Sequence, residues 1–276
     1  MNRARIRGLG VHAVLIIGVL ISIFPFYWII VMATNTTTAI YRNPPAFWLG
    51  SQLFTNIKHV FANIDFLGSL WNTTLVSVVT TVVVLLVDSL AAFAFAKFDF
   101  PGKRFLFGLL LLLFMLPVQL ALVPRFIIVA KLGLAGTLTA LAVPSIANAF
   151  GIFWMRQYTL GAVPDELLDA VRMEGCGFFR QYWHVVLPCV RPAMSFLGIY
   201  TFINVWNDYI WPLVVLVDPN KLTLQVALAQ LNVSHGTDYS MVMAGVLLGV
   251  LPLLVVFSLF ARGFVTDATK GALSAG

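Results

Sequence analysis

Six acidic and basic side chains, all Asp, Glu or Arg, gather in one short interior stretch of a chain that is otherwise poor in charge. The stretch runs from Val163 to Pro188 and reads VPDELLDAVRMEGCGFFRQYWHVVLP, whereas the whole chain is 60% hydrophobic and 10% charged. Carboxylates and guanidinium groups at such close spacing can pair with one another, cap helices or bind a charged partner. We call residues 163–188 the charged segment, and its Asp, Glu and Arg residues are Asp165, Glu166, Asp169, Arg172, Glu174 and Arg180.

The pattern within the charged segment predicts two short amphipathic helices around a glycine elbow. Pro164 suits a first helical position, and the acidic residues that follow it suit the positive end of a helix dipole. Gly175 and Gly177 predict a helix stop with a sharp change of direction. The second helix is expected to end at Leu187-Pro188. Such a hairpin could lie on membrane headgroups, or it could dock into a groove of a soluble partner.

The composition around the charged segment is that of a membrane protein. Mean hydropathy is +0.94, and soluble domains carry about a quarter of their residues as charges. The net charge of +6 comes from 17 Lys and Arg against 11 Asp and Glu. These cations form no basic run, so the sequence does not predict nucleic-acid binding.

Six segments are long and apolar enough to cross a bilayer, for which about 20 residues are needed. We therefore predict an all-α membrane protein whose residues 1–276 form a single permease-like domain. Prolines inside these segments predict kinked or locally broken helices. The predicted spans are residues 11–33, 70–95, 105–128, 137–155, 193–215 and 241–260.

The distribution of Lys and Arg predicts the orientation. With both termini in the cytoplasm, twelve cations lie inside and five outside, as the positive-inside rule expects. The charged segment, between the fourth and fifth spans, is then cytoplasmic. The five cations left outside are Arg42, Lys58, Arg125, Lys131 and Lys221.

The order of residues in the charged segment resembles the "EAA" coupling loop of ABC importer permeases. That order is Pro-x-Glu-Leu-x-acid-Ala, then acid-Gly, then Leu-Pro about a dozen residues later. Where the usual form has Glu-Ala-Ala and Asp-Gly-Ala, this chain has Asp-Ala-Val at 169–171 and Glu-Gly-Cys at 174–176. The matching residues are Pro164, Glu166, Leu167, Asp169, Ala170, Glu174, Gly175, Leu187 and Pro188.

The resemblance extends along most of the chain from Val11. AAFAFAKFDFPGKR (Ala91 to Arg104) resembles the family's turn after the second span, and WNDYIWPL (Trp206 to Leu213) resembles its carbohydrate-importing branch. FVTDATKGA (Phe264 to Ala272) resembles that branch's ending, with Asp267 where glycine is usual. Glycerol phosphate and polyol importers share the branch.

The resemblance implies a bacterial inner-membrane subunit that couples closure of an ATPase to alternating access for a di- or oligosaccharide. The implied partners are a second permease subunit, two ATP-binding subunits, an extracytoplasmic sugar-binding protein and membrane lipid. The coupling loop would comprise residues 159–192. Its implied ATPase-coupling residues are Glu166, Asp169, Ala170, Glu174, Gly175, Phe178, Phe179, Tyr182, Leu187 and Pro188.

Polar residues in the predicted spans are candidates for a translocation path, because a charge at the bilayer centre is costly and usually faces the bundle interior. Asn207 and Asp208 could line such a path, contact the second permease, or form an interhelical hydrogen bond. Trp206 is the one tryptophan that we separate from the interfacial belt. Asp88 is treated in the same way.

The sequence predicts neither an enzyme nor a cofactor or metal site. It contains no His-Glu-x-x-His, no Gly-x-Ser-x-Gly and no phosphate-binding Gly-x-x-x-x-Gly-Lys-Ser/Thr motif, so ATP hydrolysis is expected on a separate chain. Its two cysteines and four histidines are not clustered at metal-ligand spacings. The alternative function is a stand-alone proton- or ion-coupled secondary carrier, with Asp88 and Asp208 as its ion sites.

Overall fold

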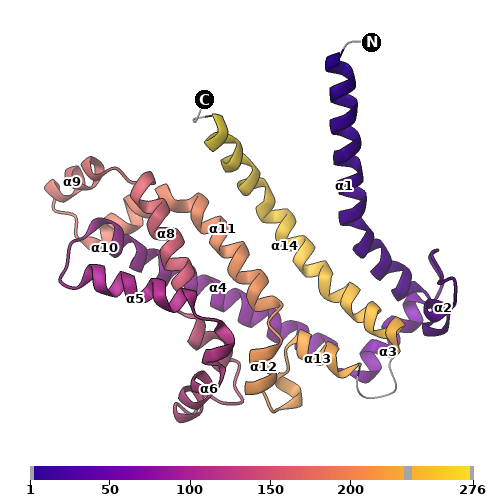
Figure 1. Cartoon of the computed structure of the whole chain (residues 1–276). Helices are drawn as coiled ribbons and strands as arrows, with labels where there is room; N and C mark the ends of the chain where they lie inside the picture. The colour runs from indigo at the N-terminus through magenta and orange to yellow at the C-terminus, as the bar shows by residue number, and fades with distance from the viewer. Residues whose placement is uncertain (1–2, 233–237, 274–276) are drawn as a thin grey trace. The chain divides into compact units, whose positions relative to one another are not determined.

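The chain folds into helices joined by short connections, with no strand among the residues described (Figure 1). The computed structural model describes residues 3–232 and 238–273, with side chains from 11 to 232 and from 238 to 258. This confirms the predicted all-α class. The long helices are α1 (Arg3–Thr34), α4 (Phe66–Lys97), α11 (Leu187–Trp206) and α14 (Tyr239–Leu273).

Four helical stretches are long and apolar enough to cross a membrane, and a sharply bent pair could supply a fifth. The predicted spans at 11–33, 70–95 and 241–260 each lie within one long helix. The predicted third span, 105–128, is bent by 101° between Lys103–Met115 and Val118–Lys131. The bend lies at Leu116-Pro117, where proline has no N–H to continue the helical ladder. Its parts are α5 (Lys103–Met115), η1 (Val118–Ala121) and α6 (Leu122–Lys131).

The predicted fourth span, 137–155, is not one helix. It consists of α7 (Thr139–Ala142), η2 (Val143–Ser145) and then α8 (Ala149–Ala162). Asn148 starts α8 by accepting hydrogen bonds from the N–H groups of Phe150 and Gly151 through its side chain. Such a cap fixes a helix start, and α8 then continues seven residues beyond the predicted boundary. The structure thus supports a helix break where a single span was expected.

The predicted fifth span, 193–215, begins within α11 (Leu187–Trp206) but is not one continuous helix. Helical structure begins at Phe178 and continues to Trp206 through α10 (Phe178–Gln181), η3 (Tyr182–Val186) and α11. α11 ends at Trp206, and the short α12 (Ile210–Val215) follows after a break. The remaining elements are α2 (Thr37–Tyr41), α3 (Leu53–Asn63), α9 (Asp165–Met173), η4 (Pro219–Lys221) and α13 (Leu224–Gln230).

The chain divides into two compact units. Unit 1 comprises residues 1–66 and 227–252, and unit 2 comprises residues 67–226 and 253–276. In unit 1 the buried Asn56 side chain donates to the carbonyls of Ala33 and Asn35, at 2.8 and 3.0 Å, and so joins α3 to the end of α1. The expectation of a single domain stays a prediction.

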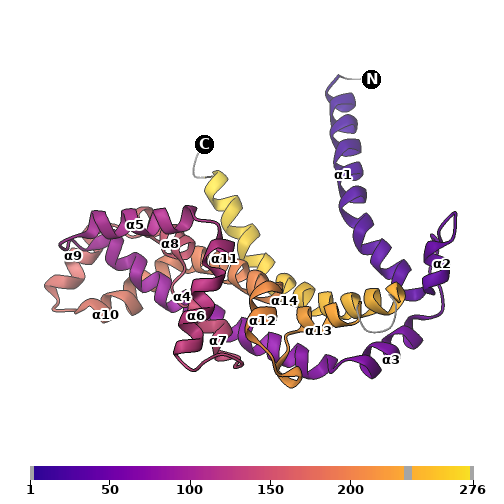
Figure 2. The ribbon, with the colours of Figure 1, turned by 60° about the horizontal axis from the view of Figure 1, so that its bottom comes forward.

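Unit 2 contains the charged segment and the main core. α8 and α11 run beside α4, with α9 and α10 at one end of the unit and α6 and α12 at the other (Figures 1 and 2). The core beneath the charged segment is made of buried side chains from α4, α8, the charged segment and α11. It includes Phe93, Met155, Leu168, Tyr182, Val186, Val190 and Leu197.

Candidate functional site

The first half of the charged segment is the helix α9. It begins at Asp165, and Pro164 precedes it in an extended conformation rather than occupying its first turn. Only Leu168 is deeply buried, at 1% exposure, whereas Leu167 is 41% exposed. Residues one position apart on a helix point about 100° away from each other. α9 therefore buries a narrow stripe and leaves the rest of its surface open.

The elbow after α9 has the hydrogen bonds of a Schellman motif. The N–H of Gly175 donates to the Arg172 carbonyl at 2.9 Å, and the N–H of Cys176 donates to the Val171 carbonyl at 3.2 Å. Gly175 has a φ of +79°, a left-handed conformation that glycine adopts without penalty. The predicted role of Gly175 in a sharp turn thus has a direct structural basis.

The second half of the charged segment does not end at Leu187-Pro188, contrary to the expectation. Residues Tyr182–Val186 form a wide helical turn, and the N–H of Leu187 donates to the carbonyl of Tyr182. Pro188 then lies in the first turn of α11, where its missing N–H is tolerated. The second half of the segment is therefore continuous with α11.

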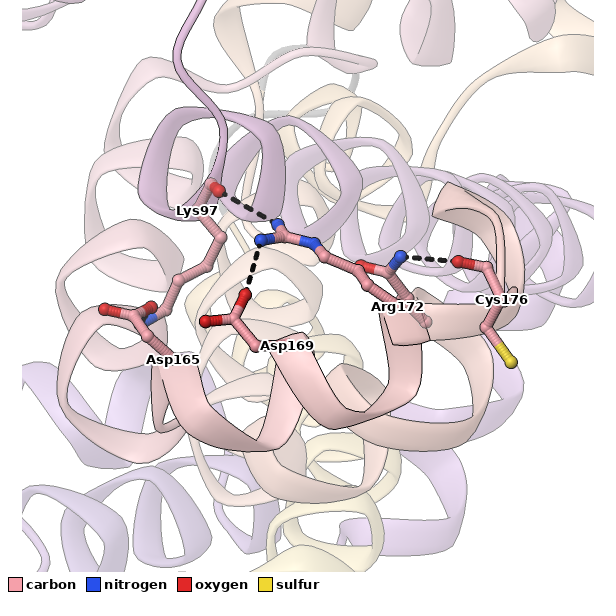
Figure 3. A network of polar contacts seen from close by, with 6 residues as sticks. Lys97, Asp165, Asp169, Arg172 and Cys176 are labelled. Atoms are coloured by element: carbon pink, nitrogen blue, oxygen red, sulfur yellow. Dashed lines mark hydrogen bonds and ion pairs between the residues drawn. The ribbon is translucent and has the colours of Figure 1, made fainter. Parts of the chain in front are cut away.

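Polar contacts attach α9 to the end of α4 (Figure 3). Lys97 Nζ donates to Asp165 Oδ1 at 2.7 Å, and Arg172 reaches the backbone carbonyl of Lys97 at 3.4 Å. Arg172 also pairs with Asp169 at 3.0 Å and lies over the Phe98 ring at 5.3 Å. The Lys97 side chain is only 5% exposed. The end of α4 thus holds the charged segment in place through Lys97.

This anchor predicts a pH dependence. The hydrogen bond from Lys97, and then its charge, lowers the pKa of the Asp165 carboxyl below its ordinary value. Because the Asp165 pKa is lower in the folded chain than in the unfolded chain, the ion pair stabilises the attachment of α9 at any pH above the ordinary Asp pKa. This stabilisation is lost as the pH falls through the lowered pKa of the folded chain. We expect hydrogen exchange of α9 amides, corrected for the intrinsic pH dependence of exchange, to accelerate below about pH 4. Asp165→Asn should show the faster exchange already at neutral pH.

The matched control is Asp169→Asn, which makes the same charge change within α9 but breaks only the pair with Arg172 on the same helix. If both variants have the same effect on exchange, the Lys97 contact is not what holds α9 to α4.

Two of the aromatic residues proposed for docking face inward. Tyr182 is fully buried, and its hydroxyl shares a 2.7 Å hydrogen bond with the hydroxyl of Ser89 on α4. Phe178 stacks on Phe93 with ring centroids 5.0 Å apart. Phe178 and Tyr182 therefore join the charged segment to α4 within this chain.

The outer surface of the charged segment combines apolar and acidic side chains. Phe179 is 66% exposed and Met173 is 89% exposed, and exposed apolar groups of this size mark interaction sites when polar residues surround them. The carboxylates nearby on this surface are exposed, as is Ala170. The acidic residues are Glu166, Asp169 and Glu174.

The candidate path residues lie at the end of α11 and not within a continuous span. Trp206 is 1% exposed and stacks on Phe202 at 5.5 Å. Asn207 follows the helix and donates to the Ile203 carbonyl at 2.9 Å. Asp208 accepts from the Trp211 N–H at 3.3 Å, which starts α12. The three residues are thus neighbours in a helix break, and their role in translocation stays a prediction.

Asp208 also lines a cavity of about 170 Å³ together with Arg125 and Trp211. The Arg125 guanidinium lies 4.2 Å from the centre of the Trp211 ring and donates to the Ser145 hydroxyl at 3.3 Å. Asp208 is therefore close to a cation from the bent α5–α6 region, a neighbour that sequence spacing did not predict.

Asp88 is fully buried on α4. Its Oδ1 accepts the backbone N–H of Asn148 at 3.0 Å, at the start of α8. Its Oδ2 has no hydrogen-bond partner among the described residues. Asp88 thus contacts the break in the predicted fourth span. It is far in sequence from the other candidate path residues, Trp206, Asn207 and Asp208.

Sequence reasoning missed the residues that hold the charged segment in place. Lys97, Ser89 and Phe98 are anchors, yet each looks like an ordinary residue of a span or its end. The one available signal was the position of Lys97, a cation that ends a long apolar run. Met173 was missed because it lies among charged residues. The side chains of Phe264 to Ala272, which carry the C-terminal resemblance, lie outside the described ones.

Several apolar helices and an exposed charged segment define an integral, multi-pass membrane component of a transporter. Residues 88–267 match the model of the family described as binding-protein-dependent transport system inner membrane component. The chain belongs to this family, which confirms the resemblance to importer permeases. It is thus a transport subunit of the inner membrane.

Relatives of similar length match nearly the whole chain. The lactose transport system permease protein of Rhizobium radiobacter is 34% identical over 263 residues, covering 95% of each chain. The arabinooligosaccharides transport system permease protein of Halalkalibacterium halodurans is 32% identical, covering 92% of this chain and 91% of its own. The sn-glycerol-3-phosphate transport system permease protein of Yersinia enterocolitica is 34% identical, with 94% and 95% covered.

A solved structure has the same fold. A chain of a bacterial ABC transporter involved in the import of the acidic polysaccharide alginate superposes with a TM-score of 0.82 at 23% identity. The match covers 95% of this chain and 98% of that one. The overall arrangement of helices is therefore one that a solved ABC transporter chain also has.

Proposed function

We propose that this chain is the carbohydrate-translocating permease subunit of an ABC importer, and that its charged segment couples it to a separate ATPase. One observation carries the coupling role. The charged segment is fixed to α4 on its inner side, while its outer side exposes Phe179 and Met173 beside carboxylates. A soluble partner that binds this surface can move α11 directly, because the second half of the segment is continuous with that helix.

The substrate class rests on the relatives. Two of them are described as permeases for lactose and for arabinooligosaccharides, and a third for sn-glycerol-3-phosphate. A di- or oligosaccharide is the substrate we propose, with glycerol phosphate as the one to test beside it. A binding protein that delivers the solute agrees with the family description. A second permease subunit and two ATP-binding subunits complete the proposed importer.

The proposed orientation places both termini and the charged segment in the cytoplasm. Twelve of the 17 Lys and Arg residues then lie inside, which is the bias that the positive-inside rule describes. In this orientation the exposed surface of the charged segment faces the compartment that contains ATP.

The experiment is purification of the tagged chain in mild detergent, followed by identification of the proteins that accompany it. We expect an ATPase, a second permease and a binding protein, and we expect ATP hydrolysis in proteoliposomes to rise with one of the three solutes. Purification of the chain alone, with solute uptake driven by a proton gradient, would instead establish the secondary carrier.

Phe179→Ala is expected to weaken retention of the ATPase by about tenfold or more, because exposed aromatic side chains often dominate docking energy. The readout is the ratio of ATPase to permease after purification. The matched control is Trp48→Ala, which removes an aromatic side chain that is 82% exposed in unit 1. Equal retention in the two variants would place the docking surface elsewhere.

A further inference from the structure

A basic cavity lies where the ends of α4 and α5 meet α8. Its volume is about 480 Å³, and Lys103, Arg104 and Arg156 line it together with Asp99. Three cations and one carboxylate leave a formal excess of 3 − 1 = 2 positive charges. All four residues belong to unit 2. The cavity is separate from the charged segment, and the proposed coupling role makes no use of it.

The cationic side chains that line the cavity interact mainly with backbone carbonyls and an aromatic ring, and in the described part of the chain only Lys103 pairs with a carboxylate there. Lys103 Nζ donates to the Phe98 carbonyl at 2.7 Å and pairs with Asp99 at 3.1 Å. Arg156 donates to the Phe95 carbonyl at 3.2 Å, and its guanidinium lies 4.2 Å from the centre of the Phe107 ring. No ion pair is recorded for Arg104 or Arg156 among the described side chains. Two guanidinium groups thus line the cavity without an acidic partner from this part of the chain.

An apolar surface continues from these cations along α5. Gly108 borders the cavity, and a side chain placed there would meet no atom within 4 Å. Beyond it Leu112 and Met115, four and seven residues after Gly108 and so on the same face of α5, are exposed. The 13 residues of α5 span about 20 Å at about 1.5 Å per residue, somewhat more than half of the roughly 30 Å hydrocarbon layer. A positive cavity therefore opens at one end of an apolar strip that runs along α5.

We propose that this cavity binds the phosphate of an anionic phospholipid, with the acyl chains lying along α5. Arg104 and Arg156 contact the phosphate, and the excess of two charges suits phosphatidylglycerol or a doubly charged lipid. Basic pockets between membrane helices on the cytoplasmic side are suited to anionic headgroups. The proposal rests on the proposed orientation, which puts Lys103, Arg104 and Arg156 inside, and is independent of the ATPase contact.

A lipid accounts for both halves of the surface. A soluble acidic ligand would pair with the cations but would not contact the adjoining apolar side chains of α5. A phospholipid pairs the charged and the apolar halves within one molecule. Guanidinium groups suit this ligand, because their planar fork can donate two hydrogen bonds to a phosphate.

The test uses the transporter with whatever subunits purify with it, in nanodiscs of phosphatidylcholine that contain increasing amounts of phosphatidylglycerol. Native mass spectrometry counts the phosphatidylglycerol molecules that stay bound. We expect Arg104→Gln to weaken this binding about fivefold, as loss of one cation near an anionic surface should. Gly108→Leu should weaken it as well by filling the cavity, and Arg104→Lys should keep most of it.

The controls change the same charge or volume elsewhere. Lys131→Gln removes a cation from the last turn of α6, and Gly18→Leu adds the same side chain at an open glycine of α1. Neither should alter the lipid count. Equal counts in the wild type, Arg104→Gln and Gly108→Leu would overturn the proposal.

Two further outcomes would also overturn it. Displacement of the lipid by a few millimolar inorganic phosphate would define a site for free anions. Loss of a protein subunit in Arg104→Gln, with the lipid count unchanged, would define a protein contact. Because the lipid is counted by mass and coupling is measured by ATPase retention, failure of one proposal is distinguishable from failure of the other.

Discussion

Gly175→Val should abolish most of the solute-stimulated ATP hydrolysis of the assembled importer while the chain still inserts into the membrane. Gly175 has a φ of +79°, and a β-branched residue in this left-handed region is a true outlier. The resulting strain of about 1–3 kcal/mol corresponds to a shift of about 5- to 150-fold between the native elbow and other conformations. The measurement is stimulated hydrolysis in proteoliposomes, normalised to permease content.

Two matched variants separate backbone strain from added bulk. No atom lies within 4 Å of a side chain placed at Gly175 or at Gly177, so neither site is crowded within this chain. Gly177 has a φ of −71°, which any residue can adopt, so Gly177→Val should retain most of the stimulation. Gly175→Asn should also retain a large part, because asparagine tolerates the left-handed region.

The order of these variants tests the mechanism. Loss of stimulation in Gly175→Val and in Gly177→Val alike would mean that the ATPase needs open space at the elbow and not its left-handed turn. Full stimulation in Gly175→Val would mean that the turn has no part in coupling. In that case the exposed surface around Phe179 would have to bind the ATPase without needing the turn at Gly175.

The helical class and three of the six spans could be predicted because hydrophobic length is a strong signal, whereas the interruptions of the other spans could not. Leu116-Pro117 bends the predicted third span by 101°, but Pro192 and Pro252 lie inside unbroken helices. A proline alone therefore does not say whether a membrane helix breaks. What decides is whether neighbouring groups can satisfy the freed backbone atoms, and that depends on the tertiary structure.

The break before α8 illustrates the same limit. The Asn148 side chain caps two N–H groups of α8, and its own N–H donates to Asp88, 60 residues earlier. From the sequence alone, Asn148 is one polar residue near the middle of an apolar run. Its role is visible only once α4 lies against α8, so the predicted 137–155 span extended through it.

The candidate site could be predicted in part. Gly175 indicated a helix stop with a sharp change of direction, and the structure has this turn, with Gly175 in the left-handed conformation. The direction of each aromatic side chain was not predictable, because Phe178 and Phe179 are adjacent and equally apolar. The structure turns Phe178 toward Phe93 and leaves Phe179 exposed. Packing against α4 makes that distinction.

Gly151→Ala should lower the yield of folded protein sharply, because Asp88 occupies the space that the new methyl group needs. A Cβ at Gly151 would lie 1.9 Å from Asp88 Oδ2 and 3.3 Å from a methyl carbon of Leu197. Asp88 is buried, and its other oxygen is held by the Asn148 N–H. Overpacking of this kind costs about 1–3 kcal/mol. The measurement is the fraction of monodisperse protein after solubilisation, together with its Tm.

A second substitution, at Asp88, tests whether the contact with Asp88 causes the loss of stability. Asp88→Ala alone should also lower stability, since the Asn148 N–H would lose its acceptor in a buried position. In the double variant the alanine at 151 fills space that the shortened residue 88 has vacated, so its added cost should fall by at least about 1 kcal/mol. Gly198→Ala is the control, because a Cβ there would lie no closer than 3.4 Å to Leu85.

Additive effects at residues 88 and 151 would refute the close contact between α4 and α8. Coupled effects would establish that Asp88 packs against Gly151 at the start of α8. The same result would bear on the carrier alternative, in which Asp88 binds the coupling ion. An Asp88→Asn variant keeps an acceptor for the Asn148 N–H and removes the charge. Transport that survives in Asp88→Asn and fails in Asp88→Ala would mean that the hydrogen bond matters and the charge does not.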